Sequence, residues 1–195
     1  MADRPPDPGA AGEWLVVYGS LMRDLPAPHA TGETDLLDRL GVGAGLRRVG
    51  PCRVAGALFD LGPYPALHRG PGDEGAVCGE LHAILDPAVL AVLDAFEGYD
   101  PRDPAGSDYL RERIELLEPS GVHGWIYVYN RPLDPNRRIG SGDWRAHLAE
   151  RRPSPHVPGS SRAAPPERDV RATRSRPRRL REREGREAGE GEGEG

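Results

Sequence analysis

The sequence predicts an α+β fold in which short strands outnumber helices, and three observations support this. Apolar or alternating segments that are typical of strands lie at residues 14–18, 54–61, 76–85, 109–117 and 125–129. Only the segment 86–98 combines apolar residues at helical spacing with start and stop signals. Strands and helices do not alternate regularly, which favours an α+β fold or a small barrel over a doubly wound parallel sheet.

The first strand, residues 14–18, is a short continuous apolar run, which is typical of a buried strand. It is expected to end at Gly19 and Ser20. Residues 35–40 have room for one or two helical turns. The Pro- and Gly-rich stretch 62–75 is expected to form a loop between the second and third strands.

The convincing helix lies in the middle of the chain. Asp86 is suited to the N-cap position, and Pro87 is suited to the first helical position. Gly98 is expected to end the helix in a left-handed conformation. The apolar residues at helical spacing are Val89, Leu90, Leu93 and Phe96.

The 195 residues suffice for one domain with an appendage. Apolar residues are concentrated before about position 150, and from residue 151 onward there is no aromatic residue. A segment this polar cannot bury enough apolar surface to offset the entropy cost of ordering it. We therefore expect a disordered N-terminus at 1–12, a folded domain at 13–150 and a disordered tail rich in Arg, Pro, Gly and Glu at 151–195.

Charge is unevenly distributed along the chain. There is no lysine, and the net charge is −5. Residues 151–195 hold 12 Arg and 8 Asp or Glu, a charge of +4, which leaves −9 for the first 150 residues. The acidic body is a poor binder of nucleic acid. Contact of the arginine-rich tail with RNA or an acidic partner stays open beside the simpler interpretation of a solvated tail.

The sequence indicates a cytoplasmic protein without a membrane, metal or cofactor partner. Its longest apolar runs fall far short of the roughly 20 residues that span a bilayer, and the N-terminus lacks the apolar stretch of a signal peptide. Cys52 and Cys78 lie far apart and are expected to be buried thiols, although a disulfide between them stays open. The six histidines show no paired ligand spacing.

The first candidate for chemistry is the tetrapeptide Tyr18, Gly19, Ser20 and Leu21, at the end of the first strand. A Gly-Ser turn at this point leaves backbone N–H groups without strand partners, and such groups can bind a carboxylate or an oxyanion. The alternative is an ordinary turn that ends a strand.

The second candidate is Glu97, at the C-terminal end of the predicted helix. A carboxylate there opposes the helix dipole, which favours a raised pKa and suits acid–base work near neutral pH. The alternative is a surface glutamate before a capping glycine. Glu80, within a predicted strand, is either a buried site carboxylate or faces water.

Seven fragments, taken in their order along the chain, resemble the gamma-glutamylcyclotransferase-like family. They are more similar to its short bacterial and gamma-glutamylamine branch than to its larger enzymes. They are VYGSLM at 17–22, DLGPYPA at 60–66, VCGEL at 77–81, LDAFEGY at 93–99, YLR at 109–111, WIYVY at 125–129 and IGSGDW at 139–144. Together they extend over roughly residues 14–145.

The resemblance implies a small mixed β-barrel with flanking short helices, whose cavity binds a gamma-glutamyl group. It implies that the loop from Tyr18 to Leu21 holds the glutamyl moiety through backbone groups and that Glu97 is catalytic. It also implies a strand tyrosine near the cavity, Tyr127, with Tyr129 on the same face as a rival.

The activity that the resemblance implies is a transferase- or lyase-type cyclisation. The gamma-glutamyl group of an amine or peptide closes to 5-oxoproline and releases the amine, with no metal and no cofactor. The expected partner is this small-molecule substrate, and a monomer is favoured. Two alternatives stay open: a non-catalytic module that binds a small acidic ligand and recruits a partner through the tail, and a function centred on the tail as a tether.

Overall fold

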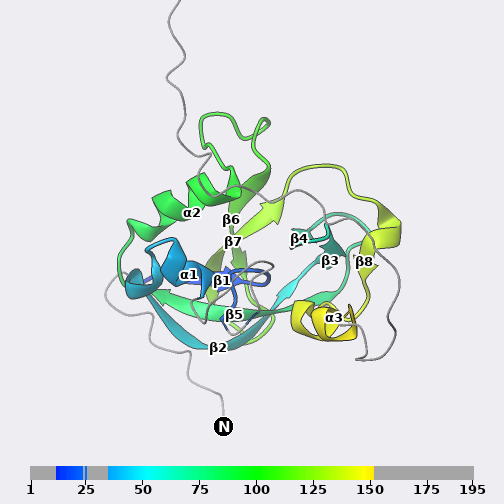
Figure 1. Ribbon diagram of the computed structural model, residues 1–195, viewed down its shortest axis with the longest axis horizontal. Coiled ribbons are helices and arrows are strands. Elements are labelled where there is room, and N and C mark those ends of the chain that lie inside the picture. The colour runs from blue at the N-terminus through cyan, green and yellow to red at the C-terminus, as the bar shows by residue number, and fades with distance from the viewer. Residues whose placement is uncertain (1–11, 24, 26–34, 152–195) are drawn as a thin grey trace, which may run out of the picture. The chain divides into compact units, whose positions relative to one another are not determined.

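The computed structural model describes residues 12–23, 25 and 35–151 (Figure 1). The predicted disordered ends therefore lie outside the described residues, apart from Gly12 and Arg151. The strands are β1 (Trp14–Val17), β2 (Leu46–Ala55), β3 (Ala57–Asp60), β4 (Pro65–His68), β5 (Ala76–Ile84), β6 (Tyr109–Glu115), β7 (His123–Tyr129) and β8 (Arg138–Ile139). The helices are α1 (Leu36–Arg39), α2 (Val89–Glu97) and α3 (Trp144–Arg151), with 3-10 turns η1 (Gly43–Gly45) and η2 (Pro135–Arg137).

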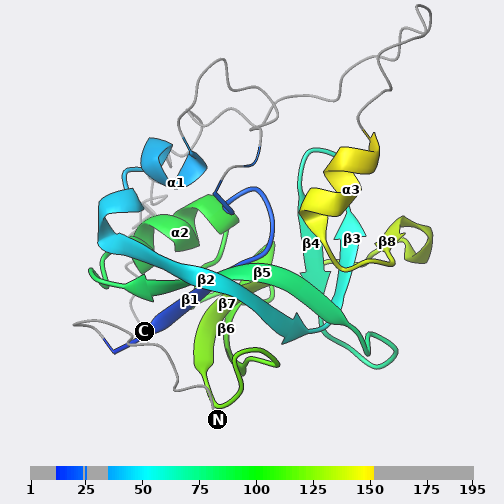
Figure 2. The same cartoon turned by 90° about the horizontal axis from the view of Figure 1, so that it is seen from below.

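The strands form two sheets (Figure 2). The larger has the order β2-β5-β1-β7-β6, in which β1 runs antiparallel to β5 and parallel to β7. The smaller has the order β4-β3-β8, and both of its pairs are antiparallel. The α+β class is confirmed.

The expected closure into a β-barrel is wrong for the described chain, because its two sheets stay open. The break lies at Gly56, between β2 and β3, which has a φ of 149°. A side chain there would approach the Leu67 side chain to 2.7 Å and the carbonyl oxygen of His68 to 2.9 Å. At this residue the chain leaves the larger sheet, so that β3 pairs with β4 and β8 instead.

The central helix is confirmed, with a small shift at its start. α2 begins at Val89, later than the expected Pro87. The N-cap residue is Ala88, without a side-chain capping bond, so the predicted N-cap at Asp86 is wrong. The Asp86 carboxylate instead accepts the N–H of Ala88 at 2.9 Å in the turn that precedes the helix. Gly98 ends the helix with a φ of 69°, as predicted.

The strands at 14–18, 76–85, 109–117 and 125–129 and the helical turn at 35–40 are confirmed within a few residues. The predicted strand 54–61 is confirmed in part: its residues are the end of a longer strand, β2, and then β3, with an interruption at Gly56. The expectation for the next segment is wrong. The predicted loop 62–75 contains β4, which pairs with β3 over four residues. Helix α3 was also not expected.

Helices α1 and α2 lie on one face of the larger sheet, and α3 lies beside the smaller sheet (Figure 2). α2 packs through Val89 and Leu93, which are 5% and 0% exposed. Truncating a wholly buried leucine such as Leu93 to alanine costs about 2–5 kcal/mol. α3 is anchored by Trp144, which is 1% exposed.

Both cysteines are free thiols, Cys52 buried and Cys78 only partly so. Among the described helices, none is both long and apolar enough to cross a bilayer.

Candidate active site

The site begins where β1 and β7 end. Because these strands are parallel, their C-terminal ends lie at the same edge of the sheet. Tyr18 directly follows β1, and its hydroxyl donates a 2.8 Å hydrogen bond to the backbone carbonyl of Tyr127 in β7. The same hydroxyl accepts the N–H of Leu67 in β4 at 3.3 Å. Tyr18 therefore joins three strands from distant parts of the chain.

The predicted substrate loop is a tight turn packed on β4. The N–H of Met22 donates to the carbonyl of Gly19 at 2.9 Å, which closes the turn. A Cβ at Gly19 would lie 2.6 Å from Cγ of Pro65, so only glycine allows this approach. Among the described residues, none accepts the N–H of Ser20 or Leu21. These two N–H groups fit the predicted role of backbone donors.

The last turn of α2 presents two carboxylates, Asp94 and Glu97, three residues apart and hence on neighbouring positions of one helix face. Asp94 is engaged twice: it accepts the hydroxyl of Tyr127 at 2.8 Å and pairs with the guanidinium of Arg111 at 3.0 Å. The guanidinium of Arg111 also lies 5.2 Å from the centre of the Trp125 ring. Asp94 thus ties α2 to β6 and β7.

Glu97 is half-buried, and its charge acts on both tyrosines. Burial raises the pKa of Tyr18, and the charge of Glu97 raises it further. Burial also raises the pKa of Tyr127, together with the hydrogen bond to Asp94, the charge of Asp94 and that of Glu97. Both phenols therefore stay protonated near neutral pH. Their hydroxyls donate to the carbonyl of Tyr127 and to Asp94 and do not act as bases, and the acid–base role of Glu97 stays a prediction.

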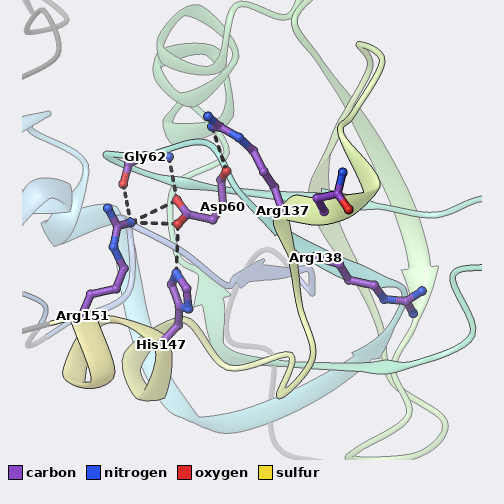
Figure 3. A pocket seen from close by; sticks show the side chains of 7 residues that line it. Asp60, Gly62, Arg137, Arg138, His147 and Arg151 are labelled. Carbon is purple, nitrogen blue, oxygen red and sulfur yellow. Dashed lines mark hydrogen bonds and ion pairs between the residues drawn. The ribbon is translucent and has the colours of Figure 1, made fainter.

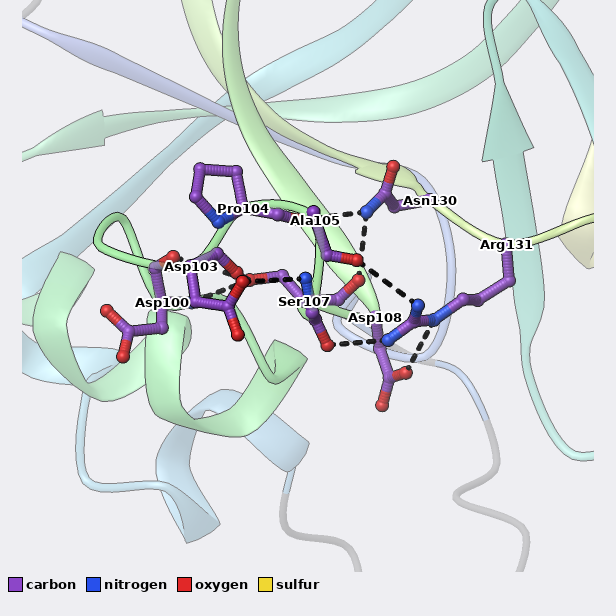
Figure 4. A network of polar contacts seen from close by, with 9 residues as sticks. Asp100, Asp103, Pro104, Ala105, Ser107, Asp108, Asn130 and Arg131 are labelled. Carbon is purple, nitrogen blue, oxygen red and sulfur yellow. Dashed lines mark hydrogen bonds and ion pairs between the residues drawn. The ribbon is translucent and has the colours of Figure 1, made fainter.

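The segment after Glu97 is held by a polar network (Figure 4). Asn130 donates to the carbonyls of Pro104 and Ser107 at 2.9 and 3.0 Å. The Ser107 hydroxyl accepts the N–H of Asp100 at 2.9 Å, and the N–H of Asp108 donates to the carbonyl of Gly98 at 3.1 Å. These contacts fix the chain that leaves α2, and with it the position of the last helical turn.

The structure separates the two candidate strand tyrosines by their contacts. The hydroxyl of Tyr127 lies at Asp94, on the helix that bears Glu97. The Tyr129 ring instead packs edge-on against Tyr109, with the ring centres 5.1 Å apart. The geometry favours Tyr127, and substrate binding by either residue stays a prediction.

Glu80 does not face water: it is 0% exposed. Burial by itself would raise the pKa of its carboxyl, but hydrogen bonds from His82, the backbone N–H of Arg23 and Arg145 outweigh burial and lower it to about 2. Glu80 is therefore an ionised carboxylate inside the sheet.

A separate cavity of about 350 Å³ lies beside β3 and α3 (Figure 3), lined by Asp60, Gly62, Asn136, Arg137, Arg138, His147 and Arg151. None of the predicted site residues lines it. Asp60 accepts from Arg151 at 2.9 Å, from His147 at 3.0 Å and from the N–H of Gly62 at 2.6 Å. Burial opposes a low pKa of Asp60, but these contacts outweigh it and lower the pKa. The cluster joins α3 to the end of β3, which is a structural role.

Sequence reasoning missed the two residues that orient the site, Asp94 and Arg111. Asp94 was detectable because it lies three residues before Glu97, the spacing that places side chains side by side on a helix. Arg111 carried no such local signal, because its partner belongs to another element.

Comparison with known proteins places these observations in a family. Residues 15–146 match the family described as "Gamma-glutamyl cyclotransferase, AIG2-like". The "Gamma-glutamylcyclotransferase family protein YtfP" of Escherichia coli (strain K12) is 41% identical over 87 residues, which cover 45% of this chain and 66% of that protein. The matched stretch thus spans just under two thirds of this relative's length.

Two solved structures share the fold. Protein PH0828 from Pyrococcus horikoshii superposes with a TM-score of 0.50 at 16% identity, over 71% of this chain and 94% of that chain. YkqA from Bacillus subtilis superposes with a TM-score of 0.50 at 23% identity, over 71% of this chain and 41% of that chain. At these identities the likeness concerns the fold alone.

Proposed function

The chain belongs to the gamma-glutamyl cyclotransferase, AIG2-like family, and on this premise we propose that it cyclises the gamma-glutamyl group of an amine or peptide to 5-oxoproline. The predicted family resemblance is thereby confirmed, whereas the reaction is the proposal. The expected cytoplasmic location, the small-molecule partner and the absence of a cofactor belong to the same proposal.

One observation supports the proposal most strongly. Tyr127, Glu97 and the turn after Tyr18 come from three separate elements. The Tyr18 hydroxyl bonds to the carbonyl of Tyr127, and the charge of Glu97 raises the pKa of both tyrosines. The proposed site combines backbone donors for a carboxylate or oxyanion with one acid–base group, on a helix that Tyr127 holds through Asp94. Together they supply what an intramolecular cyclisation requires.

The reaction needs no nucleophile from the protein. The α-amine of the substrate attacks the δ-carbonyl carbon of its own gamma-glutamyl amide, so that the ring C–N bond forms and the bond to the leaving nitrogen breaks. Holding the substrate folded brings the amine to the carbonyl, and such proximity is worth several kcal/mol. We assign the binding of the substrate carboxylate or the developing oxyanion to the N–H groups of Ser20 and Leu21.

Glu97 moves the protons. The α-ammonium, with a reference pKa of about 8, must lose a proton before it can attack. We assign this proton to the carboxylate of Glu97, which then protonates the departing nitrogen. The α-nitrogen loses two protons between ammonium and lactam, and the leaving nitrogen gains two in becoming an ammonium. The reaction therefore balances without water or a co-reactant.

The test is to incubate the full chain with a panel of gamma-glutamyl amines, amino acids and peptides and to measure 5-oxoproline by mass spectrometry. Time-dependent formation above a heat-inactivated control is the expected result, and the best substrate identifies the leaving amine. Ligand binding by a well-folded protein without any turnover would instead support the non-catalytic binding module.

A further inference from the structure

Glu80 lies in the middle of β5, paired in register with Val17 of β1 and Pro51 of β2. Four groups from different parts of the chain surround its carboxylate. They are the guanidinium of Arg145 in α3, the guanidinium of Arg48 in β2 at 3.0 Å, the backbone N–H of Arg23 at 3.0 Å and Nε2 of His82 at 3.4 Å. A buried carboxylate is costly unless such partners compensate it.

Glu80 and Arg145 both contact the backbone of one residue, Arg23. Arg23 donates its N–H to one carboxylate oxygen of Glu80. The guanidinium of Arg145 donates both to the other oxygen of Glu80 and, at 2.8 Å, to the carbonyl of Arg23. Both backbone polar groups of Arg23 are therefore held by a single ion pair.

Arg23 directly follows the turn that begins at Gly19. Among the described residues, one backbone hydrogen bond closes that turn, from the N–H of Met22 to the carbonyl of Gly19. A turn with so few bonds of its own needs an anchor at its far end to keep its N–H groups in one geometry.

We propose that Glu80 and Arg145 are positioning residues that clamp the backbone N–H and carbonyl of Arg23 and so fix the substrate-binding turn at 19–22. The contacts of Glu80 and Arg145 with Arg23 are the evidence for this clamp. Its effect on turnover rests on the proposed cyclotransferase function.

The chain offers a matched control in Arg48. Its guanidinium pairs with the same oxygen of Glu80 as that of Arg145, and the two side chains are 42% and 39% exposed. Among the described residues, the contacts of Arg48 do not include Arg23. Arg145→Ala and Arg48→Ala therefore each remove one ion pair from Glu80, but only the first releases the carbonyl of Arg23.

The first readout is amide hydrogen exchange of the full chain, followed by mass spectrometry of peptides that cover residues 18–23. We expect exchange in this segment to be about tenfold faster in Arg145→Ala and within about twofold of wild type in Arg48→Ala. The second readout is turnover of the best gamma-glutamyl substrate. We expect KM to rise about tenfold in Arg145→Ala with kcat changed less than about threefold, because a turn that holds the substrate carboxylate binds the ground and transition states alike.

Equal exchange in the two variants would overturn the clamp, even in an active enzyme. Faster exchange with an unchanged KM would overturn its role in substrate binding. If wild type turns over no gamma-glutamyl compound, the proposed function fails, and the exchange comparison alone decides the clamp. Should Arg145→Ala fail to fold, Arg145→Lys against Arg48→Lys repeats the test, because a single ammonium does not reproduce the bridging guanidinium.

Discussion

The hydroxyl of Tyr18 donates a 2.8 Å hydrogen bond to the carbonyl of Tyr127, 109 residues further along the chain. This bond fixes the start of the substrate turn against the strand whose phenol contacts Asp94. Because Asp94 and Glu97 share the last turn of α2, the bond also sets the turn relative to the proposed acid–base carboxylate. The site is thus assembled by the sheet and not by one contiguous motif.

The contacts of the two strand tyrosines predict different effects on turnover. Tyr127→Phe removes the hydrogen bond to Asp94, and we expect kcat/KM to fall about tenfold, since a hydrogen bond to a charged group contributes about 1.5 kcal/mol. Tyr129→Phe retains the packing against Tyr109 and leaves the contact of Tyr127 with Asp94 intact, and we expect a smaller fall in kcat/KM than in Tyr127→Phe. Steady-state kinetics with one gamma-glutamyl substrate tests both. Equal losses would remove the distinction between the two positions.

The contact between Gly19 and Pro65 predicts a steric cost. In Gly19→Ala the new methyl group would lie 2.6 and 2.9 Å from two carbons of the Pro65 ring, which has little freedom to move. We expect the free energy of unfolding to fall by about 1–3 kcal/mol. Gly140→Ala, where no atom lies within 4 Å of the added Cβ, is the control and should change it by less than about 0.5 kcal/mol. Chemical denaturation measures both, and an unchanged Gly19→Ala midpoint would contradict the close approach.

The low pKa of Glu80 predicts a loss of stability in acid. Its folded-state pKa of about 2 lies below the ordinary 4.5. The stabilisation by Glu80 is therefore complete above about pH 4.5 and is lost as the pH falls toward 2, because the unfolded chain binds the proton first. The shift corresponds to about 3 kcal/mol.

The measurement for Glu80 is urea denaturation at about pH 5.5 and about pH 2.5. Glu80→Gln should lose about 2–3 kcal/mol less than wild type between these conditions, because most of the titration of Glu80 in the unfolded chain falls between them. The exposed Glu115 lies on β6, and Glu115→Gln should lose as much as wild type. The same pH dependence in Glu80→Gln as in wild type would show that this carboxylate is not the group that titrates.

Local signals in the sequence were enough for the elements whose boundaries are set by nearby residues. α2 is delimited by the turn at Asp86 that precedes it and by the left-handed conformation of Gly98 at its end, both of which depend on nearby residues. β1 was recognisable because every side chain from Trp14 to Val17 is buried, so that the apolar run has no polar interruption.

Features that depend on pairing over long distances were not predictable in this way. β4 lies in a Pro- and Gly-rich stretch and is a strand because Pro65–His68 pairs with β3. The open sheets depend on the break at Gly56. For the candidate site, Glu97 and the turn after Tyr18 were marked by local sequence, whereas the partners of Glu80 and Asp94 come from elements that the fold alone brings together.

The most direct test of the central claim is the rate of 5-oxoproline formation by Glu97→Gln beside wild type and Glu115→Gln, with one gamma-glutamyl substrate at saturation. Both variants exchange a carboxylate for an amide, but only the first removes the proposed acid–base group. We predict that Glu97→Gln folds, binds the substrate and loses at least about 100-fold in kcat, while Glu115→Gln matches wild type. Wild-type turnover by Glu97→Gln would contradict the account.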